Sequence, residues 1–395
     1  MGAKIASLTY NTYFTPLPRI PVNQNLFMLL KILLDFADFR LGTVSFVTAF
    51  VICMLLMPLL IKLINYFKLY DLPDLRKEHT QPVPTMGGVA ICTGMAVACA
   101  IWFPFSRELF TISFFFSIAV LFVLGILDDL HNISAQNKLV IQLAVASLIA
   151  FTDVRIHSFN GLFGIYELPV IAQYTFTIIT IAGITNAFNL IDGIDGLAGG
   201  IGFMSLLLLG LFLTLSNDGN SALIAFSLAG GILGFLYYNF NPARIFMGDT
   251  GSLVLGFVVS VLCIKLLQLS SSFSSSVLPH GPILVLAIVL VPVFDTLRVF
   301  SLRIWSGKSP FAPDKTHIHH LLTNNGWSHS FTSKIICSMH GCLLVLAYFL
   351  KNLPQEVGLA ILLLCMFLIV FLFKNLKMPQ RYRVLQMQLL AKNPE

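Results

Sequence analysis

The feature that most constrains this chain is a series of long apolar segments between residues 43 and 373. Most are roughly 18 to 22 residues long, which is the length that a helix needs to cross the ~30 Å hydrocarbon core of a bilayer. Because a backbone inside a bilayer must satisfy its hydrogen bonds internally, these segments must be helices. We therefore predict an all-α integral membrane protein with about eleven transmembrane helices, at residues 43–66, 86–103, 109–127, 138–153, 168–187, 197–215, 221–238, 251–268, 281–301, 332–350 and 357–373.

The composition agrees with a membrane protein. Only 11% of the residues are charged and 57% are hydrophobic, whereas a soluble domain carries about 25% charged residues. All seven cysteines lie inside apolar segments without a CxxC pair, so we interpret them as packing residues. The net charge of +6 bears on membrane orientation and does not indicate a nucleic-acid partner.

No long soluble segment remains between the spans, so residues 1–395 are predicted to form a single polytopic membrane domain. Within the N-terminal segment, 1–42, residues 1–24 lack the apolar core of a cleavable signal peptide, and we expect the first span to direct insertion. Its apolar stretch at 25–37 is predicted to be an interfacial helix. Residues 374–395 form a basic tail.

Basic residues are concentrated in alternate loops. The odd-numbered loops and the tail hold most of them, whereas the even-numbered loops hold only Arg107, Arg155 and Lys351. The positive-inside rule then places the odd loops and the C-terminus in the cytoplasm. Arg19, Lys31 and Arg40 run against this assignment for the first span only.

The odd loops also carry the acidic motifs, beginning with Asp128 and Asp129 at the end of the third span. Two adjacent carboxylates repel each other unless a cation lies between them. An acidic helix end in water is one interpretation. A Mg²⁺ site or a general base is the other, since Mg²⁺ prefers carboxylates together with substrate phosphate oxygens.

The fifth loop, TNAFNLIDGIDGLAGG, contains the strongest motif. Asn186, Asn189, Asp192 and Asp195 are spaced by three, which stacks polar groups on one face of a helix or tight turn. Such groups are costly at a membrane boundary without a partner. A glycine-rich calcium loop is the alternative, although an EF-hand requires a longer acidic pattern.

The seventh loop, NFNPARIFMGDTGS, places Asp249 directly before another apolar segment. A turn and helix cap would explain the Gly-Asp-Thr-Gly-Ser stretch by itself. A third acidic loop on the same predicted face favours a shared metal site.

Cations and imidazoles lie on the same face. The ninth loop holds Arg303, Lys308 and three histidines, His317, His319 and His320, which suit a phosphate-rich anion better than a plain surface loop. A zinc site is a weaker alternative because this loop holds neither a cysteine nor an HExxH motif. The first loop adds Arg76, Lys77 and His79, which would contact a nucleotide or lipid headgroups, and Lys138 opens the fourth span near the interface.

Together these segments resemble the polyprenyl-phosphate N-acetylhexosamine-1-phosphate transferase family, which is of glycosyltransferase family 4 type. The resemblance covers residues 76–322 and rests on five pieces in chain order: RKEHTQPVPTMGG, GILDD, NAFNLIDGIDGLAGG, NFNPARIFMGDTGS and PFAPDKTHIHHLL. All five lie on the predicted cytoplasmic face.

The resemblance implies that a polyprenyl phosphate oxygen attacks the β-phosphorus of a UDP-N-acetylhexosamine, with Mg²⁺ as cofactor and Mn²⁺ as its substitute. By motif position Asp249 would bind the metal, and Asp128, Asp129 and Asp192 would lie beside it. Asp128 would be the favoured base.

The remaining site residues follow from the same resemblance. Asn186, Asn189, Asp192 and Asp195 would hold the nucleotide and the geometry of the site. The three histidines of the ninth loop would contact the diphosphate or the sugar, with Arg303 and Lys308 binding substrate nearby. Lys138 would meet the lipid phosphate.

The histidine pattern favours one branch of this family. A run interrupted by Ile318 is similar to the bacterial N-acetylglucosamine branch, which begins O-antigen, common-antigen or teichoic-acid linkage synthesis. The motif PTMGG in the first loop instead resembles the branch that takes UDP-N-acetylmuramoyl-pentapeptide. The resemblance implies undecaprenyl phosphate as lipid partner, the bacterial cytoplasmic membrane as location and an active site facing the cytoplasm. It is also compatible with a homodimer.

Three alternatives stay open at this point. A two-step reaction through a phospho-aspartyl enzyme competes with a single in-line displacement. A membrane transporter would also carry acidic and amide residues, although near the bilayer midplane. A CDP-alcohol transferase would need a longer acidic signature, which this sequence lacks.

Overall fold

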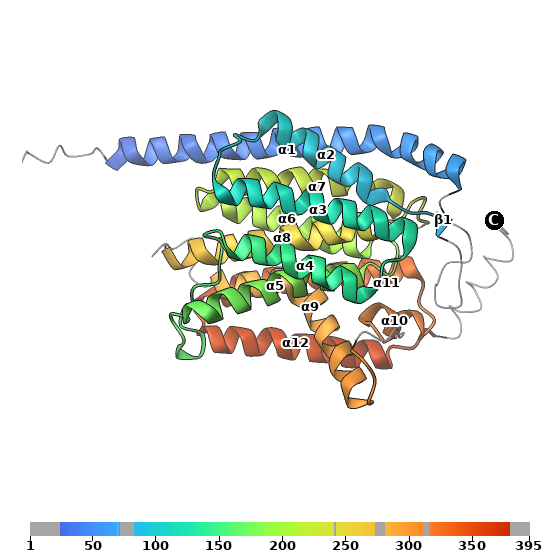
Figure 1. Cartoon of the computed structure of the whole chain (residues 1–395). Helices are drawn as coiled ribbons and strands as arrows, with labels where there is room; N and C mark the ends of the chain where they lie inside the picture. The colour runs from blue at the N-terminus through green and yellow to red at the C-terminus, as the bar shows by residue number, and fades with distance from the viewer. Residues whose placement is uncertain are drawn as a thin grey trace, which may run out of the picture.

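The computed structural model describes residues 24–68, 70–71, 83–240, 242–272, 281–310 and 316–379. Over these residues the chain is almost entirely helical (Figure 1). The elements, in order, are α1 (Gln24–Phe67), β1 (Tyr70–Asp71), β2 (Val83–Pro84), α2 (Gly87–Trp102), α3 (Leu109–His131), α4 (Ala135–Ala150), η1 (Leu162–Gly164), α5 (Val170–Ile191), α6 (Leu197–Leu215), α7 (Gly219–Asn239), α8 (Gly248–Ser272), α9 (Gly281–Trp305), α10 (Ile318–Thr323), α11 (His329–Phe349), η2 (Leu350–Asn352) and α12 (Gln355–Asn375). The predicted all-α membrane fold is confirmed.

A helix forms at each of the eleven predicted spans. In the described part of the chain, nine helices are long and apolar enough to cross a membrane. The helices α2 and α4 are also apolar but have only 16 residues each. At ~1.5 Å per residue they fall short of a full crossing.

The N-terminal helix differs from the prediction. Residues 25–37 are helical, but they do not form a separate interfacial helix, because α1 continues without a break from Gln24 to Phe67. This N-terminal part extends α1 beyond the other helices at one end (Figure 1). Residues 25–37 contain no glycine or proline that would end a helix, and Gly42, directly before the predicted span, lies within α1.

Burial sorts the helices into inner and outer ones. In α7 and α8, 78% of the apolar window is buried, whereas in α1 and α12 only 22% is. The central helix α8 packs against α2, α3, α5, α6 and α9. The exposed leucines and phenylalanines of the outer helices then face lipid, which a soluble bundle would not tolerate.

Polar residues gather at one end of this bundle. The last turn of α3, the end of α5, the end of α7 and the first turn of α8 lie around one cavity, and α10 adds a fifth side to it. The short strands β1 and β2 pair antiparallel, with Tyr70 opposite Pro84. They lie at the same end as α10 (Figure 1).

Candidate active site

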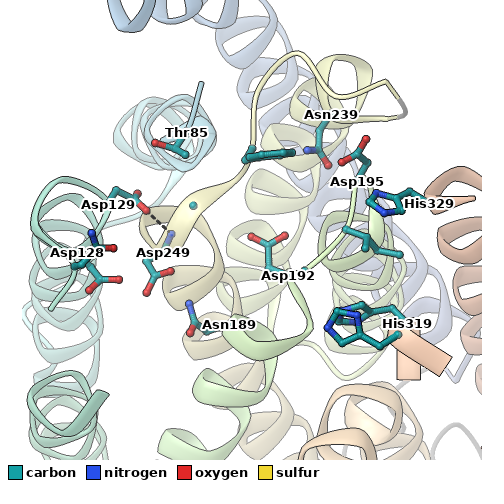
Figure 2. Close-up of a pocket in the computed structure, with 16 residues that line it drawn as sticks. Thr85, Asp128, Asp129, Asn189, Asp192, Asp195, Asn239, Asp249, His319 and His329 are labelled. Carbon is teal, nitrogen blue, oxygen red and sulfur yellow. Dashed lines mark hydrogen bonds between the residues drawn. The ribbon is translucent and has the colours of Figure 1, made fainter. Parts of the chain in front are cut away.

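The cavity has a volume of about 380 Å³. One side is acidic and the other carries imidazoles, and Figure 2 shows Asp192 between Asp249 and His319. The lining residues are Thr85, Asp128, Asp129, Asn132, Asn189, Asp192, Gly193, Ile194, Asp195, Asn239, Phe246, Gly248, Asp249, His319, His320 and His329. The structure therefore brings together residues from the third, fifth, seventh and ninth predicted loops.

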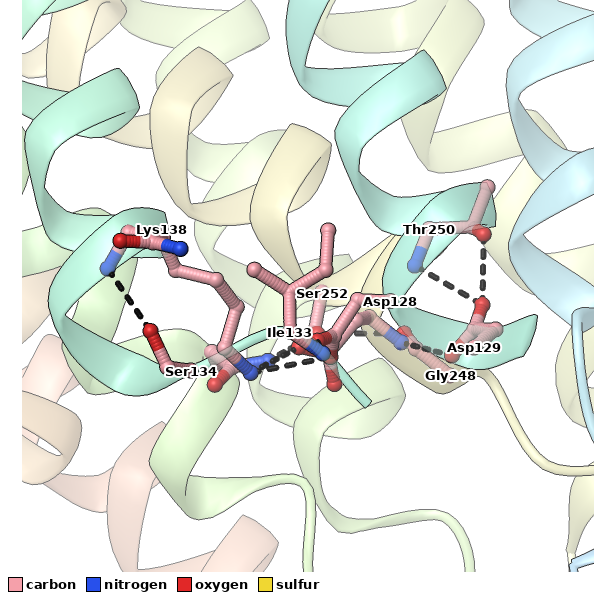
Figure 3. A network of polar contacts seen from close by, with 11 residues as sticks. Asp128, Asp129, Ile133, Ser134, Lys138, Gly248, Thr250 and Ser252 are labelled. Atoms are coloured by element: carbon pink, nitrogen blue, oxygen red, sulfur yellow. Dashed lines mark hydrogen bonds and ion pairs between the residues drawn. The ribbon is translucent and has the colours of Figure 1, made fainter. Parts of the chain in front are cut away.

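Lys138 connects two of the acidic side chains. Its Nζ atom donates to Asp128 Oδ2 at 2.9 Å and to Asp249 Oδ2 at 2.7 Å (Figure 3). Asn132 adopts a left-handed conformation that ends α3, and the Ile133 amide then donates to Asp128 Oδ1 at 2.6 Å. Ser134 caps α4, which places Lys138 in the first turn of that helix. The lysine offsets part of the repulsion between the two carboxylates.

Asp129 makes different contacts from those of Asp128. One carboxylate oxygen accepts the Asp249 amide at 2.8 Å, and the other accepts the Thr250 amide at 3.2 Å and the Thr250 hydroxyl at 2.6 Å. An acidic side chain at the first turn of a helix satisfies its free amides and complements its dipole. Asp129 thus fixes the start of α8, which carries Asp249.

Gly248 makes this close approach feasible. Its φ is +72°, and a Cβ atom there would lie 2.7 Å from the Asp129 carboxylate. An L-residue would be strained in that conformation and would push Asp129 away. Position 248 therefore requires glycine both for its backbone conformation and for the close contact with Asp129.

The loop after α5 supplies Asp192 and Asp195. Burial, followed by the nearby carboxylates of Asp249, Asp129 and Asp195, raises the pKa of Asp192 to about 8. The Asp195 carboxylate accepts the Ala243 amide at 3.1 Å, and its carbonyl accepts the Ser333 hydroxyl at 2.6 Å. Asp195 therefore ties this loop to the seventh loop and to α11.

Two asparagines hold the same loops in place. Asn189 Nδ2 donates to Ser252 Oγ at 3.0 Å, which joins α5 to α8. Asn239 Oδ1 accepts the Gly196 amide at 2.8 Å, and its Nδ2 donates to the Ile245 carbonyl at 2.9 Å. Asn239 therefore links the fifth and seventh loops.

The three histidines of the ninth loop do not share one position. His319 and His320 line the cavity, and both are buried. His317 is buried as well, but it does not line the cavity, and its Nδ1 atom lies 2.8 Å from Asp295 Oδ2 on α9. Its ring stacks on His319 at 5.9 Å between centroids and 5° between planes.

Several predicted site residues lie elsewhere. Asn186 is on α5, one turn before Asn189, and does not line the cavity. Arg303 is buried at the end of α9, where it donates to the Pro310 carbonyl, and Lys308 is exposed beyond that helix. Arg76, Lys77 and His79 lie outside the described residues.

The sequence interpretation missed four contributors. Thr85, Asn132 and His329 line the cavity although they belong to none of the predicted sites. Asp295 is the fourth, and its signal was present, because an acidic residue within an apolar span usually has a function or a partner. Thr85 and His329 gave no comparable signal, since single polar residues next to a span are common.

The donor chemistry of the acidic side fits a hard divalent cation. Carboxylate and amide oxygens are the ligands of Mg²⁺ and Mn²⁺, and no cysteine is among the lining residues. Among the described residues, no three His, Cys, Asp or Glu side chains are grouped so that they would hold a metal ion. The ammonium of Lys138 takes the place of a cation between Asp128 and Asp249.

Fold and site together define a multi-pass membrane protein with an acid-rich polar cavity at one end of its helices. Residues 111–267 match the family described as Glycosyl transferase family 4. A Bacillus subtilis (strain 168) protein named probable undecaprenyl-phosphate N-acetylglucosaminyl 1-phosphate transferase is 36% identical over 336 residues, which cover 83% of this chain and 89% of the relative. An Escherichia coli (strain K12) protein named undecaprenyl-phosphate alpha-N-acetylglucosaminyl 1-phosphate transferase is 29% identical over 324 residues, or 78% of this chain and 84% of the relative.

The chain belongs to glycosyl transferase family 4. It is an enzyme of the phosphoglycosyltransferase class, as the sequence motifs predicted.

Proposed function

We propose that this enzyme transfers N-acetylglucosamine-1-phosphate from UDP-N-acetylglucosamine to undecaprenyl phosphate, releases UMP and thereby begins a cell-envelope polysaccharide. The observation that carries the proposal is the cavity itself, which joins carboxylates and three histidines at the ends of the helices, with Lys138 bonded to two of those carboxylates. A site at helix ends can meet a soluble nucleotide and a lipid phosphate at once. A transporter would place these groups near the bilayer midplane.

Lys138 is the residue that we assign to the lipid phosphate. Lys138 is not among the residues that line the cavity, but its Nζ atom bonds to Asp128 and Asp249, which do, and its side chain is 19% exposed. A cation near the membrane interface attracts an anionic headgroup, and a charge-assisted hydrogen bond to phosphate is strong. Asp128 accepts a hydrogen bond from the same ammonium, which supports its assignment as the base that takes a proton from the phosphate.

Asp249 and Asp192 are the residues that we expect to hold Mg²⁺, with Mn²⁺ as a substitute. When bound, the ion neutralises charge that develops on the diphosphate and the leaving UMP. Asp129 holds the amides at the start of α8 and so positions Asp249. Both of its oxygens accept hydrogen bonds from residues 249 and 250, so we assign Asp129 to positioning.

The proposed reaction is a single in-line displacement. An oxygen of the lipid phosphate forms a bond to the β-phosphorus, the bond from that phosphorus to the bridging oxygen breaks, and UMP leaves with the electron pair. The proton from the lipid phosphate passes to Asp128. Inversion of configuration at the β-phosphorus is expected, whereas retention would indicate a phospho-aspartyl intermediate.

The imidazole side of the cavity is where we place the diphosphate and the sugar. His319 and His320 can donate hydrogen bonds to phosphate or sugar oxygens. The names of the relatives support N-acetylglucosamine as the sugar. We also propose that this end of the bundle faces the bacterial cytoplasm, where UDP-sugars are soluble and where the loops richest in Lys and Arg are expected.

Purified protein in detergent tests this proposal. It is incubated with undecaprenyl phosphate, Mg²⁺ and one of three donors: UDP-N-acetylglucosamine, UDP-N-acetylgalactosamine or UDP-N-acetylmuramoyl-pentapeptide. We expect UMP and a glycolipid with the first donor and at least about tenfold lower kcat/KM with the others. Preference for the pentapeptide donor would overturn the sugar assignment. Folded protein that turns over none of the three would favour the transporter.

Gly193 offers a test of the histidine side. A Cβ atom at this position would lie 2.7 Å from His319 Nε2, so Gly193→Ala must displace the imidazole. We expect KM for UDP-N-acetylglucosamine to rise by about tenfold, with KM for the lipid unchanged. Gly183→Ala is the matched control, because a Cβ atom there meets nothing within 4 Å. Equal effects of the two substitutions on KM would contradict the assignment.

Cation binding should depend on pH through Asp192. Its carboxyl pKa of about 8 means that a proton occupies the group at neutral pH and competes with the cation. We expect the apparent Mn²⁺ affinity, measured by calorimetry, to rise by up to about tenfold per pH unit as the pH approaches 8 and then to level off. Asp192→Asn should flatten this dependence. A steep dependence that survives the substitution would assign the proton to another group.

A further inference from the structure

Asp295 is a buried carboxylate that lies outside the cavity. It belongs to α9, within an apolar helix, and is 1% exposed. Its Oδ1 atom accepts the Ile318 amide at 2.9 Å and the Arg298 guanidinium at 2.8 Å, and its Oδ2 atom lies 2.8 Å from His317 Nδ1. A charge in such a position is retained only where partners satisfy it, and here three do so.

These bonds determine the state of His317. A carboxylate oxygen can only accept, so the hydrogen of the contact must lie on Nδ1 of the imidazole. This fixes both the tautomer and the plane of the ring, as it does when a carboxylate orients a catalytic or metal-binding histidine. The same carboxylate holds the first amide of α10, and Arg298 donates to the Thr316 carbonyl.

The orientation of His317 passes to the cavity through His319. The two rings are almost parallel, at 5° and 5.9 Å. His319 in turn lies against Gly193, beside Asp192 in the loop after α5. A rotation of His317 would therefore disturb the ring that lines the cavity, although His317 does not line it.

We propose that Asp295 is a positioning residue that acts through His317 to orient His319 at the nucleotide-sugar side of the cavity. In this arrangement His317 packs against His319 outside the cavity and does not contact the substrate. The inference rests on the proposed function, because it assumes that His319 meets the UDP-sugar.

The first test is kinetic. In Asp295→Asn the single oxygen still has to accept the Ile318 amide and Arg298, which leaves the NH₂ group facing His317. This group cannot accept the Nδ1 hydrogen, so His317 must change tautomer or turn. We expect kcat/KM for UDP-N-acetylglucosamine to fall by about 10- to 100-fold, with a higher KM for that substrate and an unchanged KM for undecaprenyl phosphate. Partial unfolding would reduce the active fraction and change neither KM. Asp218→Asn is the control. Asp218 pairs with Lys265 at 3.0 Å, at the start of α7 and near the end of α8, whereas the cavity lies at the other end of both helices.

Two further variants test the route through His317. The amide of His317→Asn can still donate to Asp295, so this variant should retain more activity than His317→Leu. Asp295→Asn should add little to the loss already seen in His317→Leu, because both substitutions break the same contact. Independent, additive losses would overturn the inference, as would an unchanged KM for the UDP-sugar in Asp295→Asn. An inactive wild-type protein would instead count against the proposed function.

Discussion

Replacing Asp249 with asparagine is expected to lower kcat by about 10²- to 10³-fold while the helix bundle stays folded. The carboxylate accepts the Lys138 ammonium and is one of the two groups that we assign to the cation. An amide removes the negative charge at the point where the leaving UMP develops its own, and loss of one such electrostatic contact costs roughly 10²- to 10³-fold. The backbone amide of residue 249 would still donate to Asp129, so the start of α8 should be retained. Transfer of labelled sugar to lipid measures the effect.

The control for this substitution is Asp218→Asn. It also removes a carboxylate from an ion pair, but at the end of the bundle that lies away from the cavity. We expect it to lower thermal stability and to leave the KM values unchanged. If Asp249→Asn retained transfer at the wild-type rate, Asp249 would have no part in the chemistry.

Lys138→Met is expected to abolish most transfer and, at the same time, to strengthen cation binding. The ammonium lies between Asp128 and Asp249, where it occupies the position of a cation and would repel a divalent ion. Two unit charges 4 Å apart interact by about 4 kcal/mol at an effective dielectric constant of 20. Exposure of the lysine reduces that figure, so we expect Mn²⁺ affinity to rise by about tenfold. Calorimetry with Mn²⁺ measures this change without any turnover.

The matched control is Lys265→Met, which removes an ammonium from the other end of α8. It should change neither Mn²⁺ affinity nor KM for undecaprenyl phosphate. Weaker Mn²⁺ binding in Lys138→Met would contradict the view that the lysine competes with the ion.

The fold and the meeting of the polar loops could be predicted from the sequence. Apolar segments of membrane-spanning length leave little alternative to helices. Acidic motifs in alternate loops must lie on one face of the membrane, whatever the packing of the helices. Asp128, Asp192 and Asp249, from three separate loops, accordingly line one cavity.

The individual partners could not be predicted in the same way. Asp128 and Asp129 are adjacent in sequence, but successive residues of a helix point about 100° apart. One therefore faces Lys138 and the other faces the start of α8. His317 and His319 also have different partners. His317 precedes α10 and contacts Asp295 on α9, whereas His319 lies within α10 and lines the cavity. Such contacts depend on packing angles that a single sequence does not specify.

The most direct test of the central claim follows two labels through one turnover. UDP-N-acetylglucosamine is prepared with a radiolabelled β-phosphorus and a different label in the sugar, then incubated with the purified enzyme, undecaprenyl phosphate and Mg²⁺. Transfer of a phospho-sugar moves both labels into the lipid in equal amounts and leaves unlabelled UMP, and we expect this result. If the sugar label alone entered the lipid and the phosphorus label stayed in UDP, the enzyme would be transferring a sugar and not a sugar phosphate, and the account would be wrong.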